Sequence, residues 1–224
     1  MDFIFMLTRS DRTVEDCLAV FDEIAPLNLK HVGFKDVGVP PATLRQLTDA
    51  IRATGAVSYM EVVSTSPEAA LNSARVARDL GIDRLLGGTQ VLETMGILKG
   101  SDTAYYPFPG KPVGHPTKLG GSAGDVEEHS ASFMAMGCAG VDLLAYRATE
   151  AEPLDLVKAA RRGLGKGTLI VAGSVSSRER IKALADAGAD AFTIGSAVFD
   201  QSYSPNKGSI RSQLKAVLED CMVA

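Results

Sequence analysis

Two stretches near the end of the chain decide the fold: IVAGSVSS at residues 170–177 and AGADAFTIGSAVF at residues 187–199. Each contains a short apolar run that is followed at once by Gly-Ser, and the segment between them has the period of an amphipathic helix. A buried strand, a turn, a helix and a second buried strand form one parallel βα unit. These stretches therefore predict consecutive strands of a parallel sheet.

The same alternation of apolar runs and helix-period segments extends from these stretches to both ends of the chain. The runs that we interpret as strands are Phe3–Leu7, Lys30–Phe34, Ala56–Val62, Arg84–Leu86, Thr103–Tyr106, Val141–Tyr146, Thr168–Ala172 and Ala191–Ile194. Eight strands in so short a chain favour closure, because an open sheet would leave two edges to protect. We therefore predict an α/β protein with one domain over residues 1–224, a parallel eight-stranded (βα)8 or TIM barrel. An open doubly wound sheet is the alternative.

Start and stop signals support the helices of this arrangement. We expect helices to begin near Thr13, Pro41, Ser66 and Ser209, and Ser176-x-x-Glu179 has the form of a capping box. A Gly-x-Asp motif also precedes three of the expected strands, at residues 81–83, 140–142 and 188–190. This faint repeat indicates that similar turns lead into several strands.

Composition excludes several classes of protein. The chain is 46% hydrophobic and 22% charged, with a net charge of −4, so it lacks the basic surface that nucleic-acid binding requires. The cysteines, Cys17, Cys138 and Cys221, are isolated in sequence and predict buried thiols in a reducing compartment. Neither a signal peptide nor a membrane span is indicated. We expect a soluble, cytoplasmic protein.

Ligands of a TIM barrel bind at the carboxyl ends of its strands. The strands expected as the seventh and eighth end in Gly173-Ser174 and Gly195-Ser196. Glycine lets the backbone approach a ligand closely, and a phosphate held by these two loops is a recurrent feature of the fold. We predict that these four residues bind phosphate; tight turns that need glycine for their own geometry are the alternative.

Residues 170–199 resemble the ribulose-phosphate-binding barrels, a group that includes histidine-pathway isomerases, N-acetylmannosamine-6-phosphate epimerases, thiamine phosphate synthases and indole-glycerol-phosphate synthases. The resemblance implies a small phosphorylated substrate. Two departures keep the chain from any individual family. The isomerases have an aspartate where this chain has Thr8-Arg9, and the epimerases have an acid where it has Gly173-Ser174.

Lys35 and Glu61 are the leading catalytic candidates, because both end neighbouring strands on the face expected to point into the barrel. Glu61 could remove a proton beside a carbonyl while Lys35 stabilises the enolate oxygen. A purely structural salt bridge is the alternative. Asp36 could replace Glu61 as the base or could cap the next helix.

Other charged or aromatic residues follow the expected strands. Arg9, Arg147 and Tyr146 are candidates for binding a second anionic group. His115 and Lys118 belong to a long loop rich in glycine and proline that could cover the mouth, with His115 as a general acid. Each of these residues could also simply be exposed.

Three functions fit these residues. The first is a cofactor-free isomerase or epimerase that acts on a small phosphorylated sugar-like metabolite. The second is an aldolase, lyase or synthase that forms a Schiff base at Lys35, and the third is a barrel that binds a phosphorylated metabolite without catalysis. No spacing typical of metal ligands occurs, so we expect neither a metal nor a cofactor. A homodimer is expected from the frequency of dimers among such enzymes.

Overall fold

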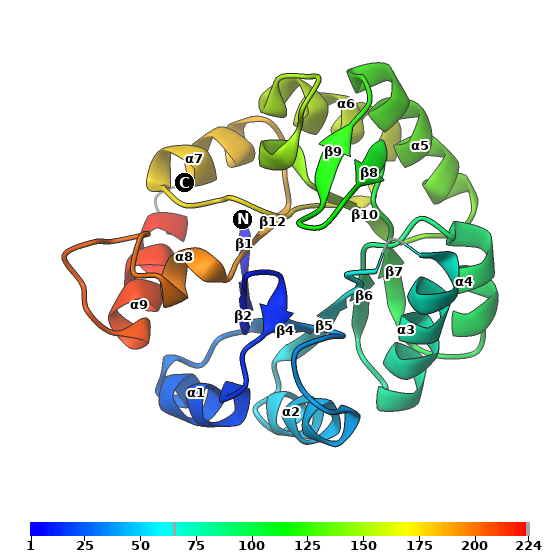
Figure 1. Ribbon diagram of the computed structural model, residues 1–224. Helices are drawn as coiled ribbons and strands as arrows, with labels where there is room; N and C mark the ends of the chain where they lie inside the picture. Colours follow the sequence, from blue (N-terminus) through cyan, green and yellow to red (C-terminus); the bar gives the residue numbers. More distant parts are fainter. Residues whose placement is uncertain (65, 223–224) are drawn as a thin grey trace.

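A computed structural model of the chain describes residues 1–64 and 66–222, and its centre is a barrel of eight parallel strands surrounded by helices (Figure 1). The strands are β1 (Asp2–Met6), β4 (His31–Lys35), β5 (Val57–Glu61), β6 (Arg84–Leu86), β7 (Ala104–Tyr106), β10 (Gly140–Leu143), β11 (Thr168–Val171) and β12 (Ala191–Ile194). They follow one another in the order β10-β11-β12-β1-β4-β5-β6-β7. Two backbone hydrogen bonds, from Ala139 to Tyr105 (3.0 Å) and from Asp142 to Pro107 (3.1 Å), connect the two ends of this order. The predicted TIM barrel is confirmed.

Helices connect the strands around the outside of the barrel. They are α1 (Cys17–Ile24), α2 (Pro41–Ala53), α3 (Pro67–Leu80), α4 (Val91–Leu98), α5 (Ala123–Ala135), α6 (Pro153–Leu164), α7 (Arg178–Asp186), the short α8 (Ser196–Phe199) and α9 (Ile210–Cys221), with 3-10 turns η1 (Ala25–Leu27) and η2 (Ala145–Arg147). Within the described part of the chain, none of these helices has both the length and the apolar character needed to cross a bilayer.

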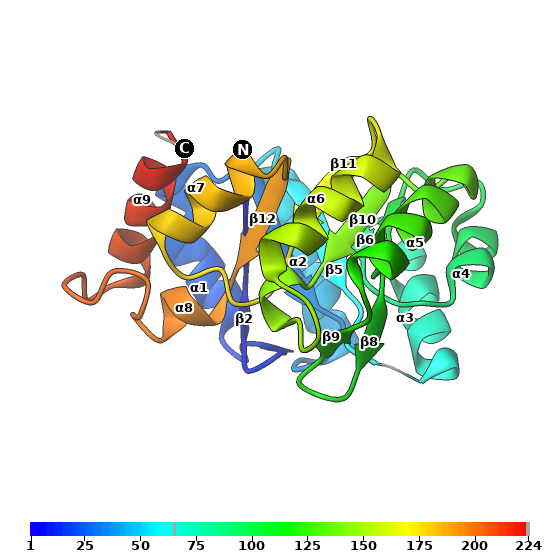
Figure 2. The same ribbon diagram turned by 90° about the horizontal axis from the view of Figure 1, so that it is seen from above.

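Two small antiparallel hairpins stand at the carboxyl end of the barrel strands. One pairs β2 (Thr8–Arg9) with β3 (Arg12–Thr13), and the other pairs β8 (Lys111–Val113) with β9 (Lys118–Gly120). Figure 2 shows both hairpins and α8 on one side of the molecule, opposite the two chain ends. This side is the mouth of the barrel, where the fold places ligands.

Alternation along the strands separates two apolar layers. On β1, Phe3 and Phe5 pack toward the helices, whereas Ile4 and Met6 point into the barrel. The interior cluster also contains Tyr59, Leu86, Tyr106, Ile170 and Ala191. Because side chains alternate between the two faces of a strand, the polar residues at interior positions near the strand ends are directed toward the mouth.

The signals for helix starts were mostly correct. α2 begins at Pro41, and the hydroxyls of Ser66 and Ser209 accept hydrogen bonds from backbone amides in the first turns of α3 and α9. The expected capping box at Ser176 is wrong by one residue, because Ser177 caps α7 by accepting from the amide of Arg180.

The prediction for Thr13 is also wrong. This residue lies in β3 rather than at the start of α1, and its hydroxyl is hydrogen-bonded to both the amide (2.9 Å) and the carbonyl (2.8 Å) of Lys35. A β-branched residue suits a short strand, and here it ties the first hairpin to the end of β4.

Near β10 the structure differs from the sequence interpretation in two ways. The strand ends at Leu143, and η2 then turns the chain so that Arg147 returns toward the barrel axis. Gly140 belongs to the strand itself, where a β-carbon would lie 1.9 Å from the carbonyl oxygen of Thr168. The Gly-x-Asp motif at residues 140–142 is therefore not a turn before a strand, and it places Asp142 inside the barrel.

Candidate active site

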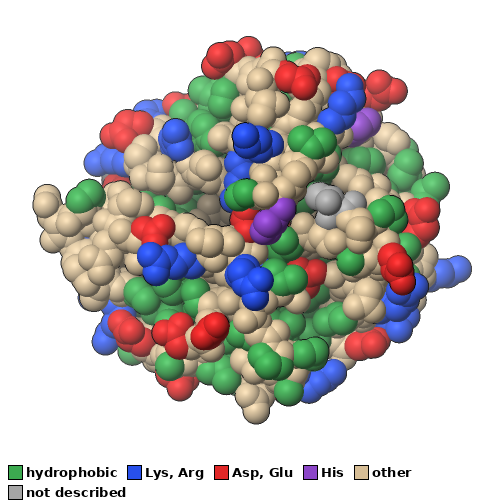
Figure 3. All heavy atoms as spheres, in the orientation of Figure 1, with side chains coloured by type: hydrophobic (Ala, Val, Ile, Leu, Met, Phe, Trp, Pro, Cys, Tyr) green, Lys and Arg blue, Asp and Glu red, His purple; other side chains and the backbone are tan. Residues whose placement is uncertain are grey.

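A cavity of about 250 Å³ opens at the mouth of the barrel, between the loops that follow β1, β10, β11 and β12. Figure 3 shows this face, where basic and acidic side chains adjoin a hollow near its centre. Ligand pockets in proteins commonly measure about 300–1,000 Å³; this cavity is slightly smaller than that range and suits only a small molecule.

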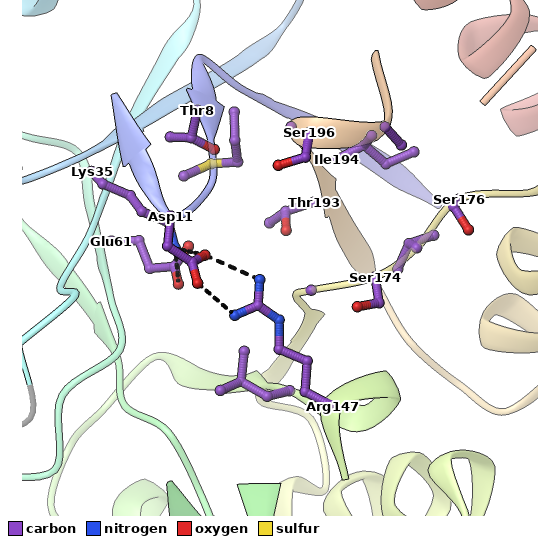
Figure 4. Close-up of a pocket in the computed structure, with 16 residues that line it drawn as sticks. Thr8, Asp11, Lys35, Glu61, Arg147, Ser174, Ser176, Thr193, Ile194 and Ser196 are labelled. Carbon is purple, nitrogen blue, oxygen red and sulfur yellow. Dashed lines mark hydrogen bonds and ion pairs between the residues drawn. The ribbon is translucent and has the colours of Figure 1, made fainter. Parts of the chain in front are cut away.

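The two Gly-Ser loops line one side of the cavity. Gly173, Ser174, Gly195 and Ser196 all contribute to its wall (Figure 4). The two segments are 21 residues apart in sequence (from 174 to 195), and the neighbouring positions of β11 and β12 bring them together.

Close packing explains why glycine occupies both positions. A β-carbon on Gly173 would lie 2.5 Å from Nε of Arg147, and one on Gly195 would lie 2.6 Å from Oγ1 of Thr8. Gly173 also has φ of +79°, and Ser174 next to it has φ of +59°. A turn with such φ values can leave successive backbone amides unpaired, and runs of unpaired amides in turns bind anions.

The backbone amides of these loops are free to bind a ligand. Within residues 1–64 and 66–222, the N–H groups of Ser174, Val175, Ser196 and Ala197 donate to no protein acceptor, and all four residues line the cavity. Unpaired amides beside a cavity can donate hydrogen bonds to a phosphate or a carboxylate.

Opposite these loops, four charged side chains form a continuous chain of ion pairs, drawn as dashed lines in Figure 4. Arg147 donates two hydrogen bonds of 3.1 Å to the two oxygens of Asp11. Lys35 Nζ lies 2.8 Å from Asp11 Oδ1 and 3.1 Å from Glu61 Oε1. Positive and negative charges alternate along this chain and balance one another.

Burial gives these charges strong mutual influence. The side chains of Asp11, Lys35 and Glu61 are only 7–8% exposed. Burial by itself would lower the pKa of Lys35, but the two adjacent carboxylates reverse this and raise it above its usual value. Burial would likewise raise the pKa of Asp11, yet hydrogen bonds from Arg147 and Lys35 hold it well below its usual range. Lys35 is therefore an ammonium group and Asp11 is a carboxylate at neutral pH.

Asp11 is the one member of this chain of ion pairs that the sequence analysis did not predict. It lies at the tip of the β2–β3 hairpin, where Ser10 and Asp11 adopt φ of +50° and +57°. Aspartate tolerates this conformation better than most residues. The polar Ser-Asp pair between Thr8 and Thr13 was a signal for such a turn, but only the folded hairpin directs the carboxylate into the cavity.

The strand-parity argument for Lys35 and Glu61 agrees with the structure, which pairs these residues in register on β4 and β5. Arg147 also lines the cavity, and its guanidinium donates to the carbonyl of Thr117 in the loop before β9 (3.3 Å). Arg147 thereby connects the first hairpin, the second hairpin and the β11 loop.

Five other candidates, Asp36, Arg9, Tyr146, His115 and Lys118, lie outside the cavity lining. The carboxylate of Asp36 accepts hydrogen bonds from the amide of Val63 (3.1 Å) and the hydroxyl of Ser73, so it holds α3 against the end of β5. The proposed capping role of Asp36 is wrong, since the residue before α2 is Pro40 and no side chain caps that helix. Burial raises the pKa of Asp36.

Arg9 and Tyr146 make contacts at the rim. Arg9 forms an exposed ion pair with Asp200 (2.7 Å). The ring of Tyr146 faces the guanidinium of Arg180, with 4.6 Å between the guanidinium carbon and the ring centroid. Arg180 in turn donates to the carbonyl of Ser174, so Tyr146 supports the β11 loop rather than lining the cavity.

His115 and Lys118 belong to the β8–β9 hairpin, which replaces the irregular loop that the sequence suggested. Both side chains are exposed, and neither lines the cavity. Thr117 and Leu119 between and beside them are buried. The hairpin is therefore anchored by alternate residues, and it directs these two candidates to solvent.

Among the described residues, no group of three or more histidine, cysteine, aspartate or glutamate side chains has a geometry that could hold a metal ion.

Comparison with known proteins identifies the architecture. No protein-family model matches the chain, and no curated protein matches its sequence. Orotidine 5′-phosphate decarboxylase from Pyrococcus horikoshii OT3 is similar in structure, with a TM-score of 0.64 and 15% sequence identity over 98% of this chain and 99% of that one. The fold is a TIM barrel.

Two further structures give the same result. A KDPGal aldolase has a TM-score of 0.67 and 14% identity, covering 99% of this barrel and 97% of its own chain. A FabK mutant from Thermotoga maritima matches 71% of this barrel and 50% of its own chain, with a TM-score of 0.53 and 16% identity. At this level of sequence identity, the three similarities show the fold alone.

Proposed function

We propose that this barrel is a cofactor-free enzyme that moves a proton next to the carbonyl group of a small phosphorylated sugar-like metabolite, as an isomerase or epimerase does. One observation supports this most directly. The buried chain of charges from Arg147 to Glu61 and the unpaired amides of both Gly-Ser loops share one small cavity. An anion-binding edge beside a set of acid and base groups is the arrangement that such a reaction requires.

In this proposal the phosphate binds to the amides of Ser174, Val175, Ser196 and Ala197. The carbonyl then extends across the cavity toward Lys35, whose ammonium group would donate a hydrogen bond to the oxygen as negative charge develops there. Glu61, on the other side of Lys35, would accept the proton from the adjacent carbon. Asp11 and Glu61 would keep Lys35 charged, and Arg147 would hold Asp11 in place.

The structural neighbours support the substrate class. The name of one specifies a 5′-phosphate substrate, and another is an aldolase. Both barrels are similar to this one over nearly their whole length. The location in the cytoplasm and the homodimer remain predictions from sequence.

A Schiff base at Lys35 is the second candidate, and the similarity to an aldolase is the observation that favours it. Schiff-base formation requires a neutral amine, whereas two carboxylates keep Lys35 protonated. Borohydride reduction in the presence of ketose and aldose phosphates separates the two proposals. We expect no covalent adduct; an adduct at Lys35 would favour the aldolase.

Solvent exchange tests the main proposal even while the product is unidentified. When the enzyme is incubated in D2O with a panel of sugar phosphates, we expect deuterium to enter the carbon next to the carbonyl of one substrate, as followed by proton NMR. Glu61→Gln should abolish this exchange. Glu93→Gln on the exposed surface of α4 is the matched control. Binding of a sugar phosphate without exchange or turnover would instead support the non-catalytic alternative.

A further inference from the structure

Asp142 is a buried acid that the proposed reaction does not yet use. It lies in β10, is fully buried, and neither of its carboxyl oxygens has a hydrogen-bond partner within the described part of the chain. The other two aspartates of the Gly-x-Asp motif are different. Asp83 accepts from the amide of Ser58 (2.8 Å) and Asp190 from that of Leu169 (2.7 Å), so both hold neighbouring strands together.

The register of β10 directs Asp142 into the barrel. Its neighbours Val141 and Leu143 pack toward the helices, and its partner across the ladder, Ile170 on β11, belongs to the interior cluster. Asp142 therefore lies among the interior side chains beneath the mouth.

Three charged groups from three different elements act on this carboxyl. They are Glu61 from β5, Lys35 from β4 and Arg147 from η2. All three belong to the chain of ion pairs described above. Burial raises the pKa of Asp142 far above its usual value, and the negative charge of Glu61 adds to this effect against the opposing influence of Lys35 and Arg147.

Charge balance explains what a neutral acid would do at this position. Lys35 and Arg147 already balance Asp11 and Glu61. An ionised Asp142 would add one negative charge in a region of low dielectric constant, beneath a cavity that is proposed to receive a phosphate ester. Buried charges interact strongly over short distances, and an unpaired buried carboxylate is itself costly.

We propose that Asp142 is a positioning residue of the site: a neutral carboxylic acid that keeps the charges of Lys35, Glu61, Asp11 and Arg147 in balance and so permits an anionic substrate to bind. This inference rests on the proposed function, and it names the residue that sets the upper pH limit for binding of the anionic substrate. When Asp142 ionises at alkaline pH, the site becomes negative and releases the anion. Asp142→Asn keeps the size and neutrality of the acid and removes its ionisation.

Infrared spectroscopy tests the protonation state directly and needs no substrate. In wild-type protein at neutral pH, we expect the carbonyl stretch of a protonated carboxylic acid, which disappears in Asp142→Asn and remains in Asp102→Asn, an exposed control. If Asp142→Asn does not fold, isotopic labelling of the aspartate carboxyl carbon in the wild type should shift the same band. Absence of this band would overturn the proposal.

Sulfate binding tests the consequence for the site, because sulfate keeps its charge across the pH range in which phosphate titrates. We expect Asp142→Asn to bind sulfate like the wild type at neutral pH. As the pH is raised and Asp142 ionises, wild-type affinity should fall about tenfold further than that of the variant, the effect of one added charge nearby. Lys35 remains protonated in this range because its pKa is raised.

The outcomes separate this inference from the proposed function. Equal pH dependence of sulfate binding in the two proteins would overturn the role of Asp142 while leaving intact the proposed phosphate site at the amides of the two Gly-Ser loops. Failure of both proteins to bind sulfate at any pH would overturn the proposed phosphate site, and with it the functional role of Asp142, even if the infrared band shows that the acid is protonated.

Discussion

The two ends of this barrel both contain charged side chains, but they use them differently. At the amino end, Arg84 lies over the rings of Tyr59 and Tyr106, with 5.5 Å and 5.7 Å between the guanidinium carbon and the ring centroids, and the hydroxyl of Tyr59 pairs with His31 (3.0 Å). At the mouth, Asp11 and Lys35 face an open cavity.

This difference separates stability from function. The aromatic rings at the amino end cover the charge and fill the interior, as expected for a structural element of the fold. At the mouth the charges are buried next to unfilled space and are supported by residues in left-handed conformations, Ser10, Asp11 and Ser174. Local strain of this kind is concentrated at functional sites.

The largest effect should come from Lys35→Met at the mouth. Removing the ammonium group leaves Glu61 buried without its partner, which costs about 3–5 kcal/mol of unfolding free energy. Urea denaturation at neutral pH measures this loss. The double variant Lys35→Met/Glu61→Leu should recover most of it, because no unpaired charge is left at that position. A single variant as stable as the wild type would show that the ion pair is not buried in solution.

Asp11→Asn should cost roughly 2 kcal/mol at neutral pH, since it removes the negative charge that pairs with Arg147 and Lys35 and replaces one of the two acceptor oxygens by a donor. The pKa of Asp11 is lowered in the folded protein, so its stabilising effect is complete above the usual value of 3.8 and is lost as the pH falls below it. The difference between wild type and variant should therefore shrink in acid. Denaturation curves at a series of pH values measure this, and a constant difference would contradict the assignment.

The pair Gly173→Ala and Gly55→Ala separates the effect of close packing from that of backbone strain. Gly173 and Gly55 have nearly the same φ, +79° and +77°, but only Gly173 has an atom, Nε of Arg147, within 2.5 Å of the position of a β-carbon. Gly55→Ala should cost about 1–2 kcal/mol for the left-handed conformation. Gly173→Ala should cost about 1 kcal/mol more, and only this variant should weaken sulfate binding. If Gly173→Ala and Gly55→Ala changed stability and sulfate binding equally, the result would argue against an anion site at the Gly173 loop.

Arg84→Met should have the smallest effect and completes the comparison. Loss of the interaction with the two rings at the amino end should cost about 1 kcal/mol. Sulfate affinity should be unchanged, because Arg84 is at the end of the barrel opposite the cavity. If Arg84→Met changed sulfate affinity without a larger loss of stability, the amino end of the barrel would not have the purely structural role assigned to it.

The strands and most helix starts could be predicted from local patterns. Arg84–Leu86 and Ala191–Ile194 were predicted to the residue, because a short apolar run between a turn and a helix signal has few other interpretations. The meeting of Gly173-Ser174 with Gly195-Ser196 followed from the same reasoning, since neighbouring parallel strands end at the same edge. The pairing of Lys35 with Glu61 followed from strand parity.

The rest of the site depends on contacts between residues far apart in sequence. Asp11 and Arg147 are 136 residues apart, and no local pattern shows that a strained hairpin and a 3-10 turn direct them to the same point. Asp142 has the same sequence motif as Asp83 and Asp190, but its depth in the strand is different. The hydrophobic pattern of each strand and helix involves residues that are close in sequence. The sequence alone was therefore enough to predict the barrel. Only the closed barrel, which brings β1, β4, β5 and β10 around one axis, decided which charges share a cavity and which acid is buried beneath them.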